Sequence, residues 1–148
     1  MSTLKLFLDT SSLLKLYHKE DGSEELLELV LGAQEIYLST LAKLEFRSAL
    51  WRKVRTKEIS KEACEEVIQI FEQDKQKYHW VLQDQRIDEA AEGLLMKWGE
   101  YGLRSLDSIQ LASAITLQFQ SDCIFHTADK TLAKLFRKEK LPGTTEKI

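Results

Sequence analysis

Short apolar runs that alternate with amphipathic segments are the sequence feature that most constrains how this chain folds. The apolar runs occupy residues 4–8, 36–38, 80–82 and 123–126. Between them, apolar residues recur at the three- and four-residue spacing of a helix face. Strands that alternate with helices predict an α/β fold, in which helices cover a mostly parallel sheet of four to five strands. The fifth strand, near the C-terminus, is weakly marked.

Short polar side chains mark where the helices should begin, because they accept hydrogen bonds from the unpaired N–H groups of a first helical turn. The predicted caps are Ser23, Ser39 or Thr40, Ser60, Asp88 and Ser105. A further helix is expected over residues 10–18, and a last one through Leu132 and Phe136.

The composition is that of an ordinary globular protein. The 148 residues are 43% hydrophobic and 30% charged, with a formal net charge of −3. We therefore expect one domain over residues 1–148. Because the chain as a whole is not basic, any contact with nucleic acid must use a local patch.

Cysteine usage and hydropathy indicate a cytoplasmic protein. Cys64 and Cys123 fit no metal-binding spacing, which favours a reducing compartment. The first apolar run is interrupted by Lys5 and is too short for a signal peptide. The uncharged stretch at 108–121 is too short to span a membrane, so we expect no membrane association.

Four acidic residues fall where a ligand site of such a fold is expected. Asp9 ends the first apolar run, and Glu45 lies about one turn into the helix after the second. Asp107 is two residues past Ser105, and Asp129 follows the fourth apolar run. Since parallel strands end at one edge of a sheet, these carboxylates should converge there.

Clustered carboxylates repel one another unless a cation lies between them. Oxygen ligands suit hard ions such as Mg²⁺ or Mn²⁺, and such a site can activate water for attack on a phosphodiester. Each Asp taken alone is also explained as a helix cap. Glu45 and Asp107 are harder to explain in that way, because both have apolar neighbours and a buried carboxylate needs a partner.

At these residues the sequence resembles the PIN-domain proteins, and most closely the VapC toxins of toxin–antitoxin pairs. The matching segments are FLDTSSLL at 7–14, LAKLE at 41–45, LRSLDSIQLASA at 103–114 and FHTAD at 125–129. A lone Asp-Thr-Ser is a weak signal, whereas four segments in this order over nearly the whole chain are a strong one. Ser108 and Gln110 depart from the small and His-like residues that are common in relatives, which leaves substrate contacts open.

The resemblance implies an α/β sandwich with parallel strands in the order 3-2-1-4-5. It implies a Mg²⁺- or Mn²⁺-dependent endoribonuclease that forms a homodimer and is held inactive by a small antitoxin protein. Asp9, Glu45 and Asp107 would be the main metal ligands. Asp129 would complete the set, or hold a second ion or a water molecule.

Hydroxyl groups beside these acids should orient the ligands or water. The candidates are Thr10, Ser11 and Thr127. Ser11 is equally well explained as a helix cap. His126, among apolar neighbours, is expected to support the fold or the ligands rather than to bind metal.

A basic stretch can supply contacts to RNA phosphates. It contains Arg47, Arg52, Lys53, Arg55 and Lys57, with Trp51 among them. The same cations are also favourable at a helix C-terminus without any ligand. Arg104 is an equal candidate, because it lies close to Asp107. Arg47, Arg52 and Arg104 are thus the predicted RNA contacts.

Two other functions compete with the ribonuclease. One is a catalytically silent interaction module that acts through a protein partner, although the presence of all four costly acids argues against it. The other is a phosphotransfer domain with Asp9 as nucleophile. The sequence after Asp9 lacks the second Asp, two residues on, that haloacid-dehalogenase-like phosphatases carry, and no acidic pair of the receiver type is present.

Overall fold

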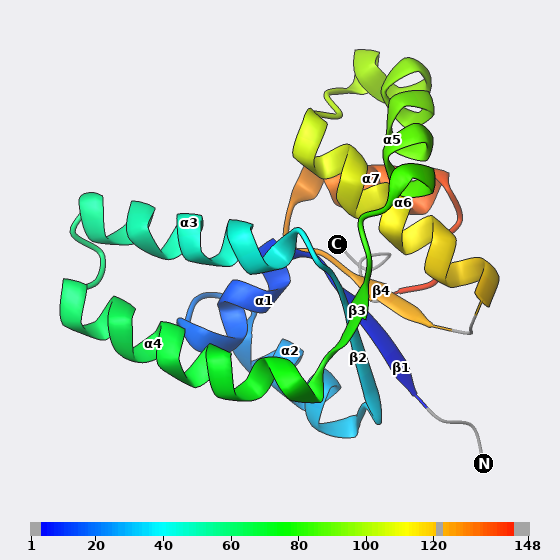
Figure 1. Ribbon diagram of the computed structural model, residues 1–148. Coiled ribbons are helices and arrows are strands. Elements are labelled where there is room, and N and C mark those ends of the chain that lie inside the picture. The colour runs from blue at the N-terminus through cyan, green and yellow to red at the C-terminus, as the bar shows by residue number, and fades with distance from the viewer. Residues whose placement is uncertain (1–3, 121–122, 144–148) are drawn as a thin grey trace.

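The computed structural model describes residues 4–120 and 123–143, and its centre is a parallel sheet (Figure 1). The strands are β1 (Lys5–Leu8), β2 (Glu35–Ser39), β3 (His79–Val81) and β4 (Ile124–His126). Their order is β3-β2-β1-β4, and each neighbouring pair is parallel. The α/β fold is therefore confirmed, and this order agrees with the first four positions of the implied one.

The expected fifth strand involves the C-terminal end, and residues 144–148 lie outside the described part of the chain. Before that point, residues 142 and 143 lie beside β4. The N–H of Phe125 donates a hydrogen bond to the carbonyl oxygen of Pro142 at 2.6 Å. Gly143 follows, and a Cβ at this position would overlap the carbonyl oxygen of Phe125, so only glycine fits so close to the strand.

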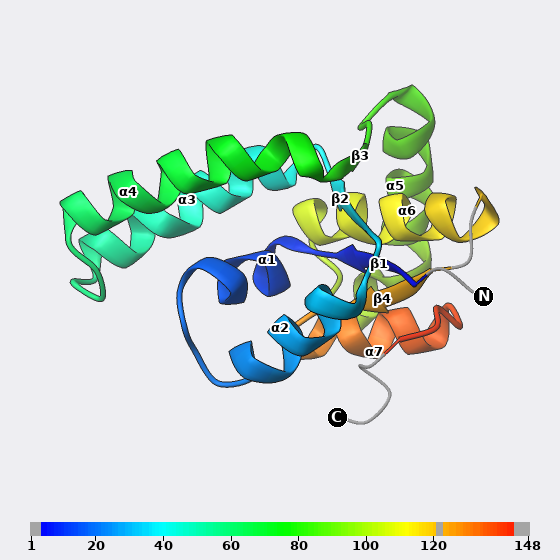
Figure 2. The ribbon, with the colours of Figure 1, turned by 90° about the horizontal axis from the view of Figure 1, so that it is seen from below.

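The helices form a layer on each face of the sheet. They are α1 (Thr10–Tyr17), α2 (Ser23–Gly32), α3 (Ala42–Arg55), α4 (Lys61–Asp74), α5 (Gln85–Trp98), α6 (Ser105–Gln120) and α7 (Lys130–Lys138), with the short 3₁₀ helices η1 (Lys75–Lys77) and η2 (Gly99–Tyr101). Helices α1 to α4 pack on one face, and α5 to α7 pack on the other (Figures 1 and 2). In the described ranges, no helix is long and apolar enough to cross a membrane.

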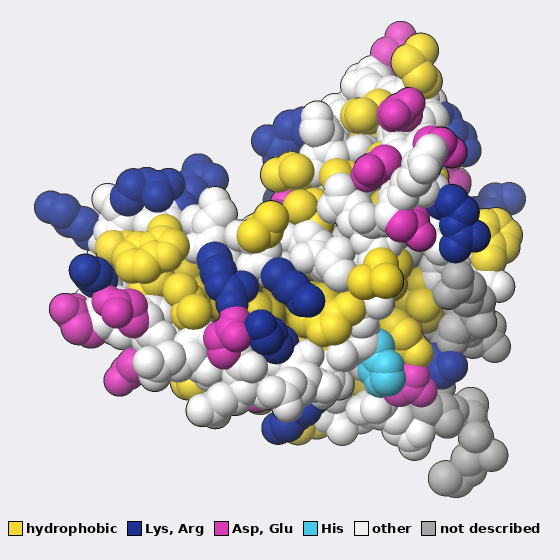
Figure 3. Space-filling view, viewed as in Figure 1, with side chains coloured by type: hydrophobic (Ala, Val, Ile, Leu, Met, Phe, Trp, Pro, Cys, Tyr) yellow, Lys and Arg dark blue, Asp and Glu magenta, His cyan; other side chains and the backbone are white. Residues whose placement is uncertain are grey.

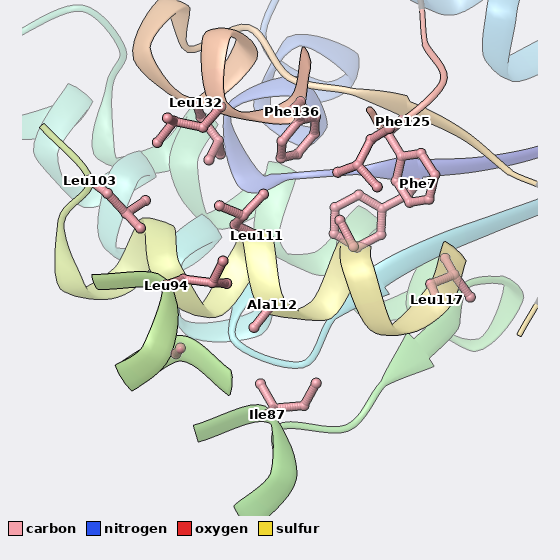
Figure 4. Packing of buried hydrophobic residues seen from close by; sticks show 14 of the residues in the cluster. Phe7, Ile87, Leu94, Leu103, Leu111, Ala112, Leu117, Phe125, Leu132 and Phe136 are labelled. Carbon is pink, nitrogen blue, oxygen red and sulfur yellow. The ribbon is translucent and has the colours of Figure 1, made fainter. Parts of the chain in front are cut away.

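Alternating side chains of β1 build both halves of the core. Leu6 and Leu8 point to the layer of α1 to α4, whereas Phe7 points to the layer of α5 to α7. The ring of Phe7 lies 5.8 Å from that of Phe125 on β4, and both face α6 (Figure 4). A central strand that is apolar on both sides is what a parallel sheet covered on both faces requires.

Helices α3 and α4 form an antiparallel pair that extends beyond the sheet (Figures 1 and 2). Phe46 of α3 and Phe71 of α4 are fully buried, and their ring centroids are 4.4 Å apart. The ring of Tyr17, at the end of α1, packs edge-on against both. This aromatic cluster fixes the base of the projecting pair.

Two helix starts show how local hydrogen bonding decides between candidate caps. Ser60 caps α4 as predicted, since its hydroxyl accepts from the N–H of Ala63. The predicted cap Asp88 is wrong, because Asp84 caps α5 by accepting from the N–H of Ile87. Asp84 and Asp88 are four residues apart, so either could begin a helix, and α5 begins at the earlier one.

The predictions for the starts of α2 and α3 are also wrong. Gly22, with a φ of 89°, is the N-cap of α2, and the hydroxyl of Ser23 donates to a backbone carbonyl of α1 instead. Leu41 is the N-cap of α3. The hydroxyl of Ser39 accepts from Leu41, and that of Thr40 accepts from the loop after β3. Both hydroxyls therefore stabilise the strand ends and not the helix.

We expect Phe71→Ala to lower the free energy of unfolding by about 3–5 kcal/mol, because it leaves a cavity in the aromatic cluster. Urea unfolding followed by circular dichroism measures this change. Phe119→Ala is the matched control, since Phe119 is 84% exposed and its loss should have little effect. Equal effects of the two substitutions would contradict this account of the core.

Candidate active site

Two of the four predicted acids end neighbouring strands and begin helices. Asp9 follows β1, and its Oδ1 accepts from the N–H of Ser12 at 3.0 Å, which caps α1. Asp129 comes shortly after β4, and its Oδ1 accepts from the N–H of Leu132 at 2.8 Å, which caps α7. Because β1 and β4 are paired, both carboxyl groups lie at the same edge of the sheet. The alternative prediction that Ser11 caps α1 is wrong, because Asp9 fills that position.

Two hydroxyl groups hold the carboxylate of Asp9. The Oγ of Ser11 lies 2.8 and 2.9 Å from its two oxygens, and Thr127 donates to Oδ2. The same hydroxyls accept from the N–H groups of Ala128 and Asp129. Ser11 and Thr127 therefore connect Asp9 with the backbone that carries Asp129.

Burial makes the charge of Asp9 costly. The residue is 3% exposed, and burial raises the pKa of its carboxyl group to about 6. The groups that oppose this shift are the hydroxyls of Thr127 and Ser11 and the contacts to Ser12, none of which is cationic. Asp9 is thus a buried carboxylate without a basic partner acting on its pKa.

Glu45 and Asp107 lie in the first turns of α3 and α6. Oε1 of Glu45 accepts from the hydroxyl of Thr10 at 2.7 Å and from Nε2 of Gln110 at 2.9 Å. Thr10 thus orients Glu45, whereas Ser11 and Thr127 orient Asp9. Gln110 was not among the predicted site residues. No periodic signal distinguishes it, because α6 also buries Ser108 and Ser113.

Two of the other acids act on Asp107. Burial raises the pKa of Asp107, the negative charge of Asp129 raises it further, and Glu45 adds to the effect. Arg104 opposes the shift, with its Nε 3.6 Å from Oδ2 of Asp107. Carboxylates from α3, α6 and the end of β4 are therefore within electrostatic reach of one another, whereas Asp9 is connected to Asp129 through Ser11 and Thr127.

A groove runs beside these acids. One cavity of about 340 Å³ is lined by Glu45, Arg104, Ser105, Leu106 and Asp107. A second cavity of about 440 Å³ shares Glu45 and Leu106. Its other lining residues are Leu41, Leu44, Ser48, Ala49, Arg52 and Arg55. Figure 3 shows the surface hollowed between the projecting α3–α4 pair and the rest of the molecule.

The predicted RNA contacts lie in different surroundings. Arg52 lines the groove, and the side chain of Arg104 is 81% exposed beside Asp107. The guanidinium of Arg47 instead pairs with Glu72 and lies over the ring of Phe71, on the side of α4. Two of the three arginines are therefore placed to meet a ligand in the groove.

His126 supports the strand ends. Its Nδ1 lies 2.7 Å from the hydroxyl of Ser12, beside the Asp9 cap, and burial lowers its pKa. A half-buried imidazole bonded to a hydroxyl of α1 matches the expected supporting role better than a metal-binding role.

The donor chemistry of the site fits Mg²⁺ or Mn²⁺, because carboxylate oxygens are the ligands that hard ions prefer. Two of the carboxyl groups, those of Asp9 and Asp107, have raised pKa values that a nearby cation would lower. Within residues 4–120 and 123–143, however, no three acidic, histidine or cysteine side chains are close enough to hold one ion. The metal therefore stays a prediction.

Residues 6–138 match the sequence model of the PIN domain family, and no curated protein matches the chain. The fold is similar to VapC20 of Mycobacterium tuberculosis, described as a sarcin–ricin-loop cleaving toxin. The TM-score is 0.65 at 14% identity, over 88% of this chain and 94% of that one. It is also similar to VapBC2 from Rickettsia felis bound to a DNA fragment from their promoter. There the TM-score is 0.63 at 17% identity, over 95% and 97% of the two chains.

The raised pKa of Asp9 predicts a pH-dependent stability of the metal-free protein. Its value rises from 3.8 to about 6 on folding, so the folded state binds this proton more tightly than the unfolded state. The stabilisation from this group is complete below about pH 4 and is lost as the pH rises through 6. We therefore expect the free energy of unfolding of Asp9→Asn, relative to that of wild type, to increase by about 3 kcal/mol as the pH rises from about 4 to about 8.

Urea unfolding in the presence of EDTA measures this difference across the pH range. The control is Asp21→Asn, which removes an exposed carboxylate. Its free energy of unfolding should differ from that of wild type by an amount that changes little with pH. A difference in free energy of unfolding between Asp9→Asn and wild type that stays constant with pH would show that burial does not destabilise the ionised carboxylate.

Proposed function

Since this chain belongs to the PIN domain family, we propose that it is a metal-dependent endoribonuclease that hydrolyses phosphodiester bonds in RNA. The observation that supports this proposal most is that the charges of Asp129 and Glu45 act on the carboxyl group of Asp107, beside a groove lined by arginines. Such a site is unfavourable without a cation and suits a ligand that brings both a metal ion and negative phosphates.

In this proposal Asp9, Glu45 and Asp107 hold Mg²⁺ or Mn²⁺, and Asp129 completes the set. When bound, the ion activates water and neutralises the charge that develops on the phosphodiester. Ser11 and Thr127 keep the Asp9 carboxylate oriented through the hydrogen bonds described above.

The cationic side chains of the groove bind the substrate. Arg104 is exposed beside Asp107 and can bind a phosphate oxygen next to the acids. Arg52 and Arg55 extend the positive charge along α3. The charge of these side chains is local, which is what a chain with a net charge of −3 needs in order to bind RNA.

We propose further that the chain is the toxin of a toxin–antitoxin pair and forms a homodimer. The similarity in fold to VapC20, described as a toxin, and to VapBC2 supports the toxin assignment, whereas the homodimer rests on the family resemblance alone. The groove offers an apolar surface to an antitoxin, because Leu44 is 70% and Leu106 is 50% exposed along it.

Asp107→Asn should lower RNA cleavage by at least about 100-fold, because several kcal/mol of transition-state stabilisation would be lost with the ion. The measurement is cleavage of RNA by purified protein, free of any copurified partner, in Mg²⁺, Mn²⁺ or EDTA. Asp88→Asn is the matched control, since Asp88 also lies in the first turn of a helix but is exposed and remote from the groove lining.

Cleavage by Asp107→Asn at the wild-type rate would contradict the assignment. If bulk RNA stays intact, a Mn²⁺ titration decides between the two functions. Binding that Asp107→Asn abolishes would support a selective nuclease. No binding by the wild type would favour the catalytically silent interaction module.

The positions of the three arginines predict how RNA binding depends on salt concentration. Fluorescence anisotropy measures this binding, and all variants also carry Asp107→Asn so that the RNA is not cleaved. Arg52→Ala and Arg104→Ala should each weaken binding and reduce the salt slope by about 0.7, the value per phosphate contact for a single strand. Arg47→Ala should leave the slope unchanged, because Arg47 is paired with Glu72. A slope that responds to Arg47 and not to Arg52 would place the RNA on the other side of α3.

A further inference from the structure

Gln110 is a buried amide that bridges three helices distant in the sequence. It lies on α6, three residues after Asp107, and is 2% exposed. Its Nε2 donates to Oε1 of Glu45 on α3 at 2.9 Å and lies 3.1 Å from the hydroxyl of Thr10 on α1. Its Oε1 is buried and has no hydrogen-bond partner in the part of the chain that the structure describes.

This arrangement is unfavourable for the fold alone. A buried amide oxygen without a partner costs free energy, and an apolar side chain of similar size would avoid that cost. The neighbouring buried positions Leu111, Ala112 and Ala114 are apolar, and the buried hydroxyls of Ser108 and Ser113 bond to backbone carbonyls of α6 itself. An amide at position 110 is therefore better explained by what its N–H group does for Glu45.

The two donors on Glu45 act on the same oxygen. Thr10 and Gln110 both bind Oε1, from α1 and α6, so the carboxylate is fixed from two directions. Among the described residues, none donates to the other oxygen, Oε2, which leaves that oxygen available to a ligand.

We propose that Gln110 is a positioning residue that fixes the carboxylate of Glu45 at the proposed divalent-cation site. This inference rests on the proposed function, because it assigns Glu45 to a metal site. It adds a residue from outside the four acids, and it makes the distance between α3 and α6 part of the site's geometry.

The test is the affinity for Mn²⁺, measured by isothermal titration calorimetry on the full chain, together with the midpoint of thermal unfolding without metal. Gln110→Met keeps the length and approximate volume of the side chain but removes the donor. We expect it to weaken Mn²⁺ binding by about 10–100-fold, the effect of removing a partner behind a metal ligand. The thermal midpoint should stay close to that of wild type, because the unpaired amide oxygen is also removed.

Two further substitutions separate positioning from packing. Ser113→Ala is the control, since Ser113 is fully buried on α6 but its hydroxyl bonds only to the carbonyl of Ile109 among the described residues. It should leave Mn²⁺ affinity unchanged. Thr10→Val should weaken binding in the same direction as Gln110→Met, and Thr10→Ser should restore it. If Gln110→Met does not fold, the smaller Gln110→Leu replaces it.

Each outcome has one meaning. Wild-type affinity in a folded Gln110→Met or Gln110→Leu protein, with binding lost in Asp107→Asn, would overturn the positioning role and leave the proposed function intact. A lowered thermal midpoint with unchanged affinity would overturn it in the same way and make Gln110 a packing residue. No Mn²⁺ binding by the wild type would instead contradict the proposed function, and the inference with it.

Discussion

The carboxylate of Asp9 is the group on which the rest of the structure depends most. One side chain begins α1, binds the hydroxyls of Ser11 and Thr127, and thereby fixes the end of β1 against the chain beyond β4. It does so while buried, where an ionised group is unfavourable. Helix capping and ligand binding are usually alternative explanations for such a residue, whereas the proposed function assigns both to the carboxylate of Asp9.

The site is built from both helix layers. Asp9 and Glu45 belong to the layer of α1 to α4, whereas Asp107 and Asp129 begin helices of the opposite layer. The spacing of the carboxylates is therefore set by how the two layers pack on β1, through Leu6 and Leu8 on one face and Phe7 on the other. Gln110 crosses this division, since it reaches from α6 to Glu45.

Sequence patterns predicted what depends on periodicity and strand topology. The four apolar runs are the four strands, and the place of each acid relative to its strand or helix follows from the parallel arrangement. Caps were less predictable, because Asp84 and Asp88 can each accept hydrogen bonds from a first helical turn, and α5 begins at Asp84. Gln110 bonds to Glu45, and Arg47 pairs with Glu72. Both partners are 25 or more residues away in the sequence, so no local pattern indicates these contacts.

The contact between Pro142 and Phe125 also determines how copies of this chain can associate. Strand β4 is an outer strand of the described sheet, and an outer strand normally exposes N–H and C=O groups to which another strand can pair. Here the N–H of Phe125 is already bonded within the chain, and Gly143 lies against its carbonyl oxygen. Among the described residues, the backbone of Phe125 is therefore already covered by the chain's own C-terminal segment and is not free to pair with a strand of another molecule.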